Sequence, residues 1–256
     1  MFQKNKYLFG LLVAICSYSP LFSQDALTVL AQGNDLDVLY RNEMNIGVLA
    51  HPNGVGINYR RCRHISGTKK GIVEFEFVNM RSPKEVKISN PNFDNSKGFI
   101  YGKLNAFQIF RPGVGYQKVL FPKAERKSVE IRLGTYIGAS IGFVKPVYLV
   151  VVNSAVNGTD NTMSIEKYDP QKHFIDNIYG RAPYFKGFGE TKIYPGGYAK
   201  LALSFEYADY HNAVKAIETG ITVDAFPKTI PIMALNKNQQ VFVSLYLSFI
   251  YGKKWF

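Results

Sequence analysis

Two acidic residues spaced two apart are the first feature of this sequence that could do chemistry. Only Phe75 separates Glu74 from Glu76, so in a β-strand both carboxylates lie on one face. Two such carboxylates could act as a paired-acid site. Arg60 falls on the preceding predicted strand, and we favour an ion-pairing role for the two acids because this cation is close at hand.

The same alternation places a larger set of charged residues opposite the apolar positions. These are Arg60, Glu74, Glu76, Lys103, Arg111, Glu130, Arg132, Lys200, Glu206, Glu218 and Asp224. The six acids and five bases nearly cancel. A barrel of eight strands is just wide enough for side chains to fill it, so we expect a structural charge network in its lumen. A gated ion path or small-solute pore is an alternative, and a catalytic set is a third.

A cluster of basic residues lies at the end of the second predicted strand and in the linker after it. This basic rim patch consists of Arg61, Arg63, Lys69 and Lys70. In the topology described below it lies at the periplasmic rim, where it could contact anionic phospholipid headgroups or a periplasmic partner. The alternative is a positively charged turn that only anchors the barrel.

Eight segments that alternate between apolar and polar residues must position these groups. They cover approximately residues 43–51, 55–63, 72–79, 103–119, 129–143, 198–208, 213–226 and 240–251. The last segment is the clearest, because Val243 and Leu245 belong to a wholly apolar face and Ser244 belongs to a mixed one. A count of ten strands is the alternative if residues 185–193 also pair.

The face of these strands that meets water decides between two folds. In a soluble sandwich or lipocalin-like cup the apolar face is buried, whereas in a membrane barrel it meets lipid and the polar face points inward. The linkers after the third, fifth and seventh segments are long, and those after the second, fourth and sixth are short. This pattern favours an all-β, antiparallel transmembrane β-barrel with one rim outside the cell and one in the periplasm.

The N-terminal residues predict export. Lys4 and Lys6 precede a short apolar stretch at residues 7–15, and cleavage is expected near residue 23 or 24. We therefore expect a signal peptide at residues 1–24, a periplasmic lead-in at 25–42 and the barrel at 43–256. Removing the signal takes away two of 31 basic residues and none of 19 acidic ones, which leaves a net charge near +10. Cys62 is then the single cysteine, which excludes an intramolecular disulfide.

The two ends of the chain carry a family resemblance. The signal ending Phe22-Ser23-Gln24 and the terminus Tyr251-Gly252-Lys253-Lys254-Trp255-Phe256 resemble those of small outer-membrane β-barrel proteins of Gram-negative bacteria, and more narrowly of uncharacterised barrels of the Bacteroidota. The terminal Phe256 resembles the signal that the barrel-assembly machinery reads, although Lys253 and Lys254 depart from its usual aromatic spacing. The resemblance covers about residues 43–256 in pattern and implies a fold and a location, but no activity.

These observations favour a non-catalytic protein of the cell outer membrane. We expect a structural role or a place as a subunit of an envelope secretion or assembly complex, with a narrow channel as the alternative and a lipid-modifying barrel enzyme as a third hypothesis. No cofactor or metal is expected. The expected partners are membrane lipid, lipopolysaccharide and other envelope proteins, and the export signal argues against nucleic acid.

Overall fold

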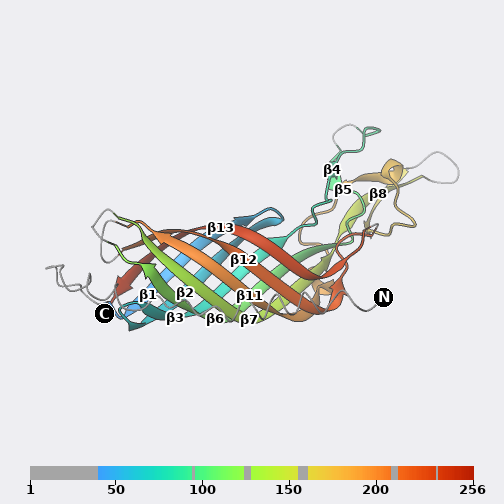
Figure 1. Cartoon of the computed structure of the whole chain (residues 1–256). Coiled ribbons are helices and arrows are strands. Elements are labelled where there is room, and N and C mark those ends of the chain that lie inside the picture. Colours follow the sequence, from blue (N-terminus) through green and yellow to red (C-terminus); the bar gives the residue numbers. More distant parts are fainter. Residues whose placement is uncertain (1–39, 94–95, 124–127, 155–160, 209–212, 235) are drawn as a thin grey trace, which may run out of the picture. The chain divides into compact units, whose positions relative to one another are not determined.

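The computed structural model describes residues 40–93, 96–123, 128–154, 161–208, 213–234 and 236–256. Eight strands form a closed barrel, in the order β1-β13-β12-β11-β7-β6-β3-β2, and every neighbouring pair is antiparallel (Figure 1). Their bounds are β1 (Asn42–His51), β2 (Gly54–Ser66), β3 (Lys69–Met80), β6 (Asn105–Phe121), β7 (Glu130–Pro146), β11 (Lys192–Glu206), β12 (Ala213–Ile230) and β13 (Gln239–Trp255). The predicted signal peptide and nearly all of the predicted lead-in lie outside the described residues.

The outer wall of the barrel is aliphatic. On β13, the side chains of Val243 and Leu245 are each 62% exposed and that of Leu247 is 44% exposed, whereas Ser244 and Tyr246 are buried inside. Such a wall would be costly in water, because apolar surface exposed to water is unfavourable at about 25 cal/mol per Å². It fits a hydrocarbon surrounding, as in a transmembrane β-barrel. The predicted antiparallel β-barrel, its eight strands and the outward direction of their apolar faces are confirmed.

The barrel has two unlike rims. The first strand begins and the last strand ends at one rim, which we call the terminal rim, and it also carries the short connection from β2 to β3. The opposite rim, called the loop rim, carries the tight turn from β1 to β2 and the three connections at residues 81–104, 147–191 and 231–238. No helix among the described residues is long and apolar enough to cross a membrane.

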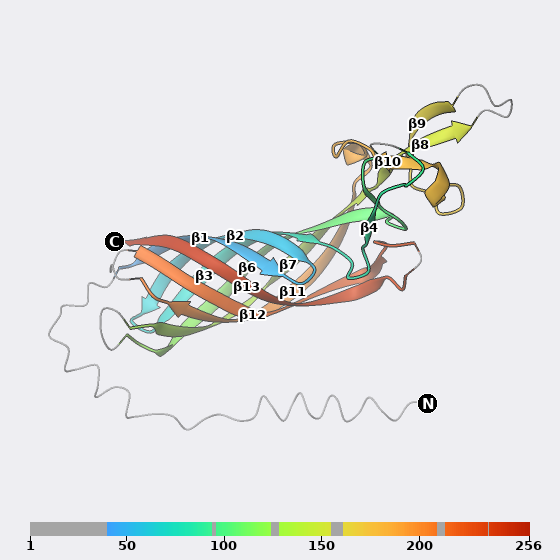
Figure 2. The same cartoon turned by 90° about the horizontal axis from the view of Figure 1, so that it is seen from above.

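Two of the loop-rim connections fold together into a small assembly beyond the barrel (Figure 2). It contains β4 (Lys87–Ile88), β5 (Phe99–Ile100), β8 (Tyr148–Ser154), β9 (Asn161–Lys167), β10 (Ile178–Arg181) and the 3-10 turns η1 (Ile175–Asn177) and η2 (Phe188–Glu190). Strands β10, β8 and β9 form a sheet, and Phe99, Leu149 and Ile178 are buried in its core. This loop assembly is built from two of the three long linkers that the sequence suggested, and its strands do not join the barrel.

Two strand expectations are wrong in detail. Strand β11 begins at Lys192 rather than near Tyr198, because the alternation continues through Gly196 and beyond the apolar band. The proline and glycines of the Arg111-Pro112-Gly113-Val114-Gly115 segment predict a bend or bulge, but the segment forms no bulge, since its register with β3 is continuous. The register shift of β6 lies instead between Val119 and Phe121, at the terminal rim.

Candidate functional site in the barrel lumen

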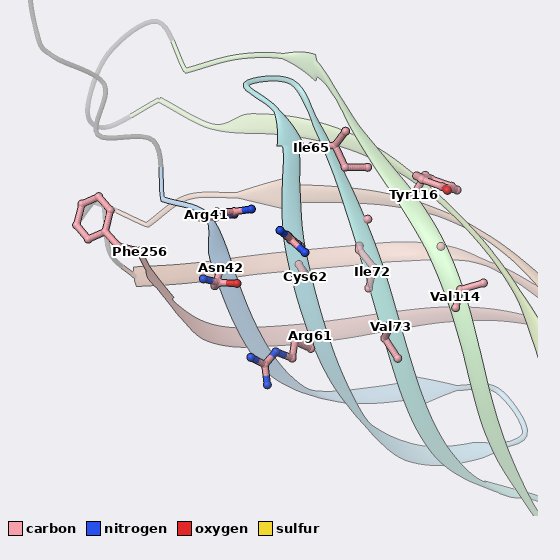
Figure 3. Close-up of a pocket in the computed structure, with 13 residues that line it drawn as sticks. Arg41, Asn42, Arg61, Cys62, Ile65, Ile72, Val73, Val114, Tyr116 and Phe256 are labelled. Carbon is pink, nitrogen blue, oxygen red and sulfur yellow. The ribbon is translucent and has the colours of Figure 1, made fainter.

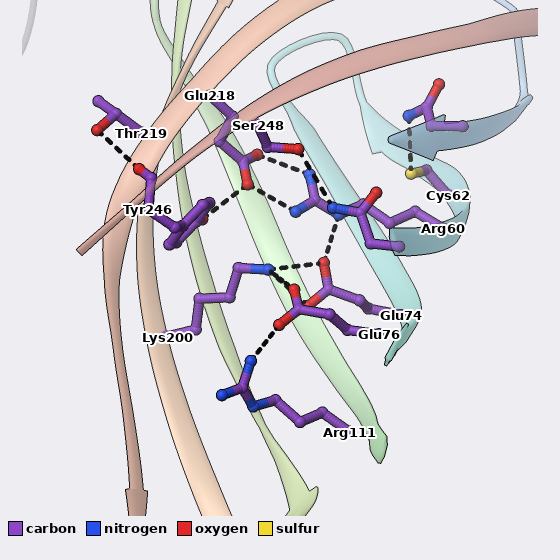
Figure 4. Close-up of polar contacts among 12 residues, drawn as sticks. Arg60, Cys62, Glu74, Glu76, Arg111, Lys200, Glu218, Thr219, Tyr246 and Ser248 are labelled. Atoms are coloured by element: carbon purple, nitrogen blue, oxygen red, sulfur yellow. Dashed lines mark hydrogen bonds and ion pairs between the residues drawn. The ribbon is translucent and has the colours of Figure 1, made fainter. Parts of the chain in front are cut away.

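An arginine crosses the middle of the lumen from one wall to the other. Arg60 on β2 donates from Nη1 and Nη2 to the two carboxylate oxygens of Glu218 on β12, at 2.6 Å each (Figure 4). Its Nε donates to Glu74 on the adjacent strand β3. The side chains are at most 2% exposed, and a bidentate arginine–carboxylate pair is among the strongest charge-assisted contacts in proteins.

A lysine holds the two acids Glu74 and Glu76, for which the sequence favoured ion pairing over a paired-acid site. Lys200 Nζ on β11 lies 3.0 Å from Glu74 Oε1 and 2.6 Å from Glu76 Oε2. Glu74 also accepts from Arg60, and Glu76 accepts from Arg111. Each carboxylate is therefore fixed by two cations, which supports ion pairing rather than proton transfer as their role.

A second arginine crosses the lumen closer to the loop rim. Arg111 donates from Nε and Nη2 to the two oxygens of Asp224, at 2.8 and 2.6 Å, and from Nη1 to Glu76. The hydroxyl of Ser140 donates to the same aspartate at 2.6 Å. Because Glu76 contacts both Arg111 and Lys200, this layer is continuous with the central one.

A third layer closes the lumen near the terminal rim. Lys70 Nζ donates to both carboxylate oxygens of Glu43, at 2.7 and 2.9 Å. Arg132 pairs with Glu206 at 2.7 Å, and Lys254 reaches the other oxygen of Glu206 at the same distance. Buried charges are tolerated only when they are paired and hydrogen-bonded. Glu43 with Lys70 and Glu206 with Lys254 meet both conditions, whereas Arg132 and Glu206 are in ion-pair contact.

An apolar plug fills the lumen on the loop-rim side of the charges. Phe107 makes ring contacts with Phe226 and Phe242 at centroid distances of 5.7 and 5.3 Å. Around them are buried Leu49, Val78, Met80, Ile109, Val144, Ile230, Ile232 and Met233. Among the described residues, the lumen retains a cavity of about 10 Å³ beside Glu43 and Arg60, which is roughly the space of one water.

The structure places ten of the eleven predicted lumen residues on the inward side of the barrel strands, with Glu130 at the rim, and Lys103 is the exception. Lys103 precedes β6 and pairs with Glu85 of the loop assembly at 2.6 Å, so its predicted place in the lumen is wrong. Lys103 lies before the strand begins at Asn105, where alternation no longer decides which side a residue faces. Glu130, the first residue of β7, is half-buried at the terminal rim and pairs with Arg132.

The basic rim patch is also divided by the alternation of the strands. Arg61, Arg63 and Lys69 are exposed on the outer wall, but Lys70 points inward and pairs with Glu43, so its place in an exposed patch is wrong. Sequence reasoning missed Glu43 and Lys254 in the lumen. The alternation of side chains along a strand could have identified both as inward residues, because their neighbours Met44 and Lys253 face outward.

The closed antiparallel barrel, the aliphatic outer wall and the ion-paired lumen define a transmembrane β-barrel. The chain is similar in structure to outer-membrane β-barrels of Gram-negative bacteria. Against Ail, the attachment invasion locus protein of Yersinia pestis, the TM-score is 0.40 at 10% identity, with 85% of this chain and 100% of that chain covered. Against Neisserial surface protein A the TM-score is 0.41 at 11% identity, with 84% and 97% covered.

The N-terminal β-barrel domain of Pseudomonas aeruginosa OprF gives a TM-score of 0.30 at 8% identity, with 82% of this chain and 97% of that chain covered. No protein family and no curated protein matches the sequence. Because these TM-scores are low, the assignment to the class rests on the geometry of the barrel itself.

Proposed function

We propose that the protein is a non-conducting, non-catalytic barrel of the outer membrane that presents the loop assembly to other components of the envelope. Its role would be structural, or that of a subunit in a secretion or assembly complex. The observation that carries this proposal is the filled lumen, in which three layers of ion pairs are backed by an apolar plug. With an even strand count, the terminal rim would face the periplasm and the loop assembly the cell exterior.

The filled lumen supports this role over that of a channel. A conducting path needs a continuous space that ions can enter and leave. Here the side chains of Arg60 and Arg111 cross to the opposite wall, and each is held by carboxylates on two different strands. Opening a path would require separating several buried charges at once, which is costly when one partner is left alone.

The loop assembly supports an interaction role because it has a buried core of its own and carries exposed aromatic side chains. Tyr184, Phe185 and Phe188 are 56%, 80% and 49% exposed, and their rings contact one another. Lys145 at the barrel rim lies 4.3 Å from the centroid of the Tyr184 ring and donates to the Tyr184 carbonyl. We call these four residues the aromatic patch. Aromatic groups exposed on an ordered support are typical of contact surfaces.

Single-channel recording in planar bilayers tests the proposal. We expect the inserted barrel to give no steady current, because the lumen is filled. Heat-dependent migration in gel electrophoresis establishes that the same sample is folded. A reproducible open current from folded protein would contradict the proposal and favour the pore.

A second experiment tests the interaction role in cells. The variant Tyr184→Ala/Phe185→Ala/Phe188→Ala should fold and insert normally but lose the proteins that co-purify with wild type from detergent extracts. The matched control Val86→Ala removes another exposed apolar side chain of the same loop rim and should keep them. Unchanged co-purification in the triple variant would remove the patch from the proposal.

A third experiment tests the alternative of a lipid-modifying barrel enzyme. Mass spectra of lipid A that differ between cells with and without the protein would favour that enzyme over the proposed role.

A further inference from the structure

A groove of about 890 Å³ lies on the outer wall of the barrel near the terminal rim (Figure 3). It is formed by outward side chains of β1, β2, β3 and β6, together with Phe256 at the end of the chain. The groove is separate from the lumen, because buried residues such as Cys62 and Ile72 point inward beneath its floor. Neither the ion-paired lumen nor the loop assembly uses it.

One side of the groove is positively charged. Arg41, Arg61 and Arg63 line it, and all three side chains are exposed. Within the part of the chain that the structure describes, no carboxylate forms an ion pair with any of them. This contrasts with Arg60, which follows Tyr59 on the same strand, points inward and contacts two carboxylates. The three arginines thus present charge that no described carboxylate neutralises through an ion pair.

The other side of the groove is apolar and open. Val73 and Val114 are cross-strand neighbours, 45% and 56% exposed, and Ile65 and Tyr116 stand at its edges. The floor is lowered at Gly71, which carries no side chain. A Cβ added there would meet only the Cδ1 of Ile65, at an ordinary contact distance of 3.6 Å.

We propose that this groove binds one phospholipid of the periplasmic leaflet, preferably with an anionic headgroup. Its phosphate lies against Arg61 and Arg63, with Arg41 beside them, and one acyl chain lies over Val73 and Val114. The charge on one side and the aliphatic surface on the other match the two parts of such a lipid. The inference rests on the proposed placement of the terminal rim in the periplasm, because that placement sets which leaflet surrounds the groove.

The position of Arg61 adds to the argument. It shares a cross-strand row with Met44 and Val73, both exposed on the outer wall. An arginine facing hydrocarbon is unfavourable unless its guanidinium reaches a polar group at the interface. A phosphate held in the groove supplies that group, and Arg63, two residues closer to the rim, can bind it too.

The single tryptophan of the chain provides a built-in probe. Trp255 pairs with Asn42, which lines the groove, so the indole reports on lipid beside the β1 edge of the groove. The experiment places the full barrel in nanodiscs that contain phosphatidylglycerol or phosphatidylcholine with brominated acyl chains, and bromine quenches nearby tryptophan fluorescence. We expect brominated phosphatidylglycerol to be preferred by about fivefold or more, which is the effect of one or two basic residues at a lipid surface.

Two double variants separate a bound lipid from general attraction to charge. Arg61→Gln/Arg63→Gln should reduce the preference to below about twofold, because it removes the phosphate contacts. Lys69→Gln/Lys118→Gln removes the same charge from a neighbouring pair of exposed residues at the same rim, outside the groove, and should preserve the preference. Equal loss in both variants, or no preference in wild type, would overturn the proposal.

Filling the groove is an independent test. Gly71→Leu should leave folding unchanged, as judged by heat-dependent migration, but abolish the single phospholipid that we expect native mass spectrometry to find on the wild-type barrel. Retention of that lipid by folded Gly71→Leu would overturn the proposal. A dimer mass that wild type shows and Gly71→Leu abolishes would also overturn it, because a second copy of the chain would then occupy the groove. A wild-type chain that fails to insert into bilayers would instead refute the proposed function.

Discussion

Buried charges in this barrel are shared rather than paired one to one. Arg60 binds Glu74 and Glu218, Lys200 binds Glu74 and Glu76, and Arg111 binds Glu76 and Asp224. Sharing means that no cation in this chain of contacts depends on one acid alone. It also means that removing one cation leaves two carboxylates short of a partner, which is more damaging than replacing a whole pair by apolar groups.

Arg60 is the residue at which this is tested most simply. We expect Arg60→Met to lower the free energy of unfolding by about 3–5 kcal/mol, because Glu218 would remain buried without its bidentate partner. Urea unfolding of the barrel in detergent micelles measures the change. Adding Glu218→Met should recover part of the loss, since the uncompensated charge is then removed. A loss below about 1 kcal/mol in the single variant would show that the pair is not held in the way described.

Two buried tyrosines form a matched test of a single hydrogen bond. The hydroxyl of Tyr246 donates to Glu218 at 2.7 Å, whereas that of Tyr198 is buried without a hydrogen-bond partner among the described residues. Tyr246→Phe should therefore cost about 1.5–3 kcal/mol of unfolding free energy, as is typical of a bond to a charged group. Tyr198→Phe should be close to neutral in the same urea titration. The reverse order would contradict the hydrogen-bond assignment.

At the scale of strands, glycines on β6 and β7 make room for large side chains in the lumen. A Cβ on Gly115 would come within 2.4 Å of the Tyr136 ring, and one on Gly138 within 2.8 Å of the Tyr198 ring. The glycines that alternate along the inward face of β7 are thus explained by packing. They allow two tyrosines to pack beside the ion pairs in a lumen that has almost no free space.

Gly138 tests this packing. A Cβ there would also lie 2.2 Å from the Pro112 carbonyl oxygen, so Gly138→Val should prevent folding or destabilise the barrel by several kcal/mol. Gly197→Ala is the control, because its Cβ would meet only the Gly138 carbonyl oxygen, at 3.6 Å. The yield of folded barrel, read from heat-dependent migration, should fall for the first variant and remain for the second. Equal yields would contradict the close approach.

In the loop assembly, the carboxylate of Glu166 on β9 forms hydrogen bonds with two side chains of the sheet and with one in the turn that follows β9. Hydrogen bonds from Ser164, Asn153 and His173 lower the pKa of Glu166 to about 2. Because the folded pKa lies below the ordinary carboxyl value of about 4.3, this contact stabilises the assembly above that pH. The contribution is lost as the pH falls toward 2.

Carboxyl NMR of the barrel in micelles measures this pKa directly. The Glu166 resonance, assigned by its absence in Glu166→Gln, should titrate near pH 2 and well below the other exposed carboxyls. His173→Ala removes one of the three contacts and should raise the midpoint. A midpoint near the ordinary carboxyl value in wild type would show that the loop assembly does not hold Glu166 as described.

At the scale of the whole molecule, the barrel was predictable because its two sides meet such different surroundings. Alternation along β13 and β7 turns one wholly or largely apolar face to the hydrocarbon and a mixed face to the lumen, so the strands and their outward faces could be read directly. The ends of the strands could not be read in this way. Strand β11 extends past the apolar band to Lys192, whereas β6 begins only after Lys103, which the sequence had included.

The loop assembly and the outer groove were not predictable for a different reason. Strand β10 is four residues long and pairs with β8, from which it is separated by β9, and its Gly180 packs against Lys97 of another loop. Such contacts depend on segments that are distant in the sequence. The groove likewise requires knowing which residues of four strands become neighbours, and only the register places Arg63, Gly71 and Tyr116 in one row.

The central claim is that hydrocarbon surrounds the apolar side of each strand while the other side faces a filled lumen. Nitroxide labels placed singly along β13, in a Cys62→Ser background, measure this through collisions with oxygen, which enters lipid, and with a polar nickel chelate, which stays in water. Labels at Val243, Leu245 and Leu247 should collide often with oxygen and rarely with the chelate, and a label at Ser248 should collide rarely with both. Frequent collisions with the chelate at the three outward positions, or low collision with oxygen there, would contradict the account.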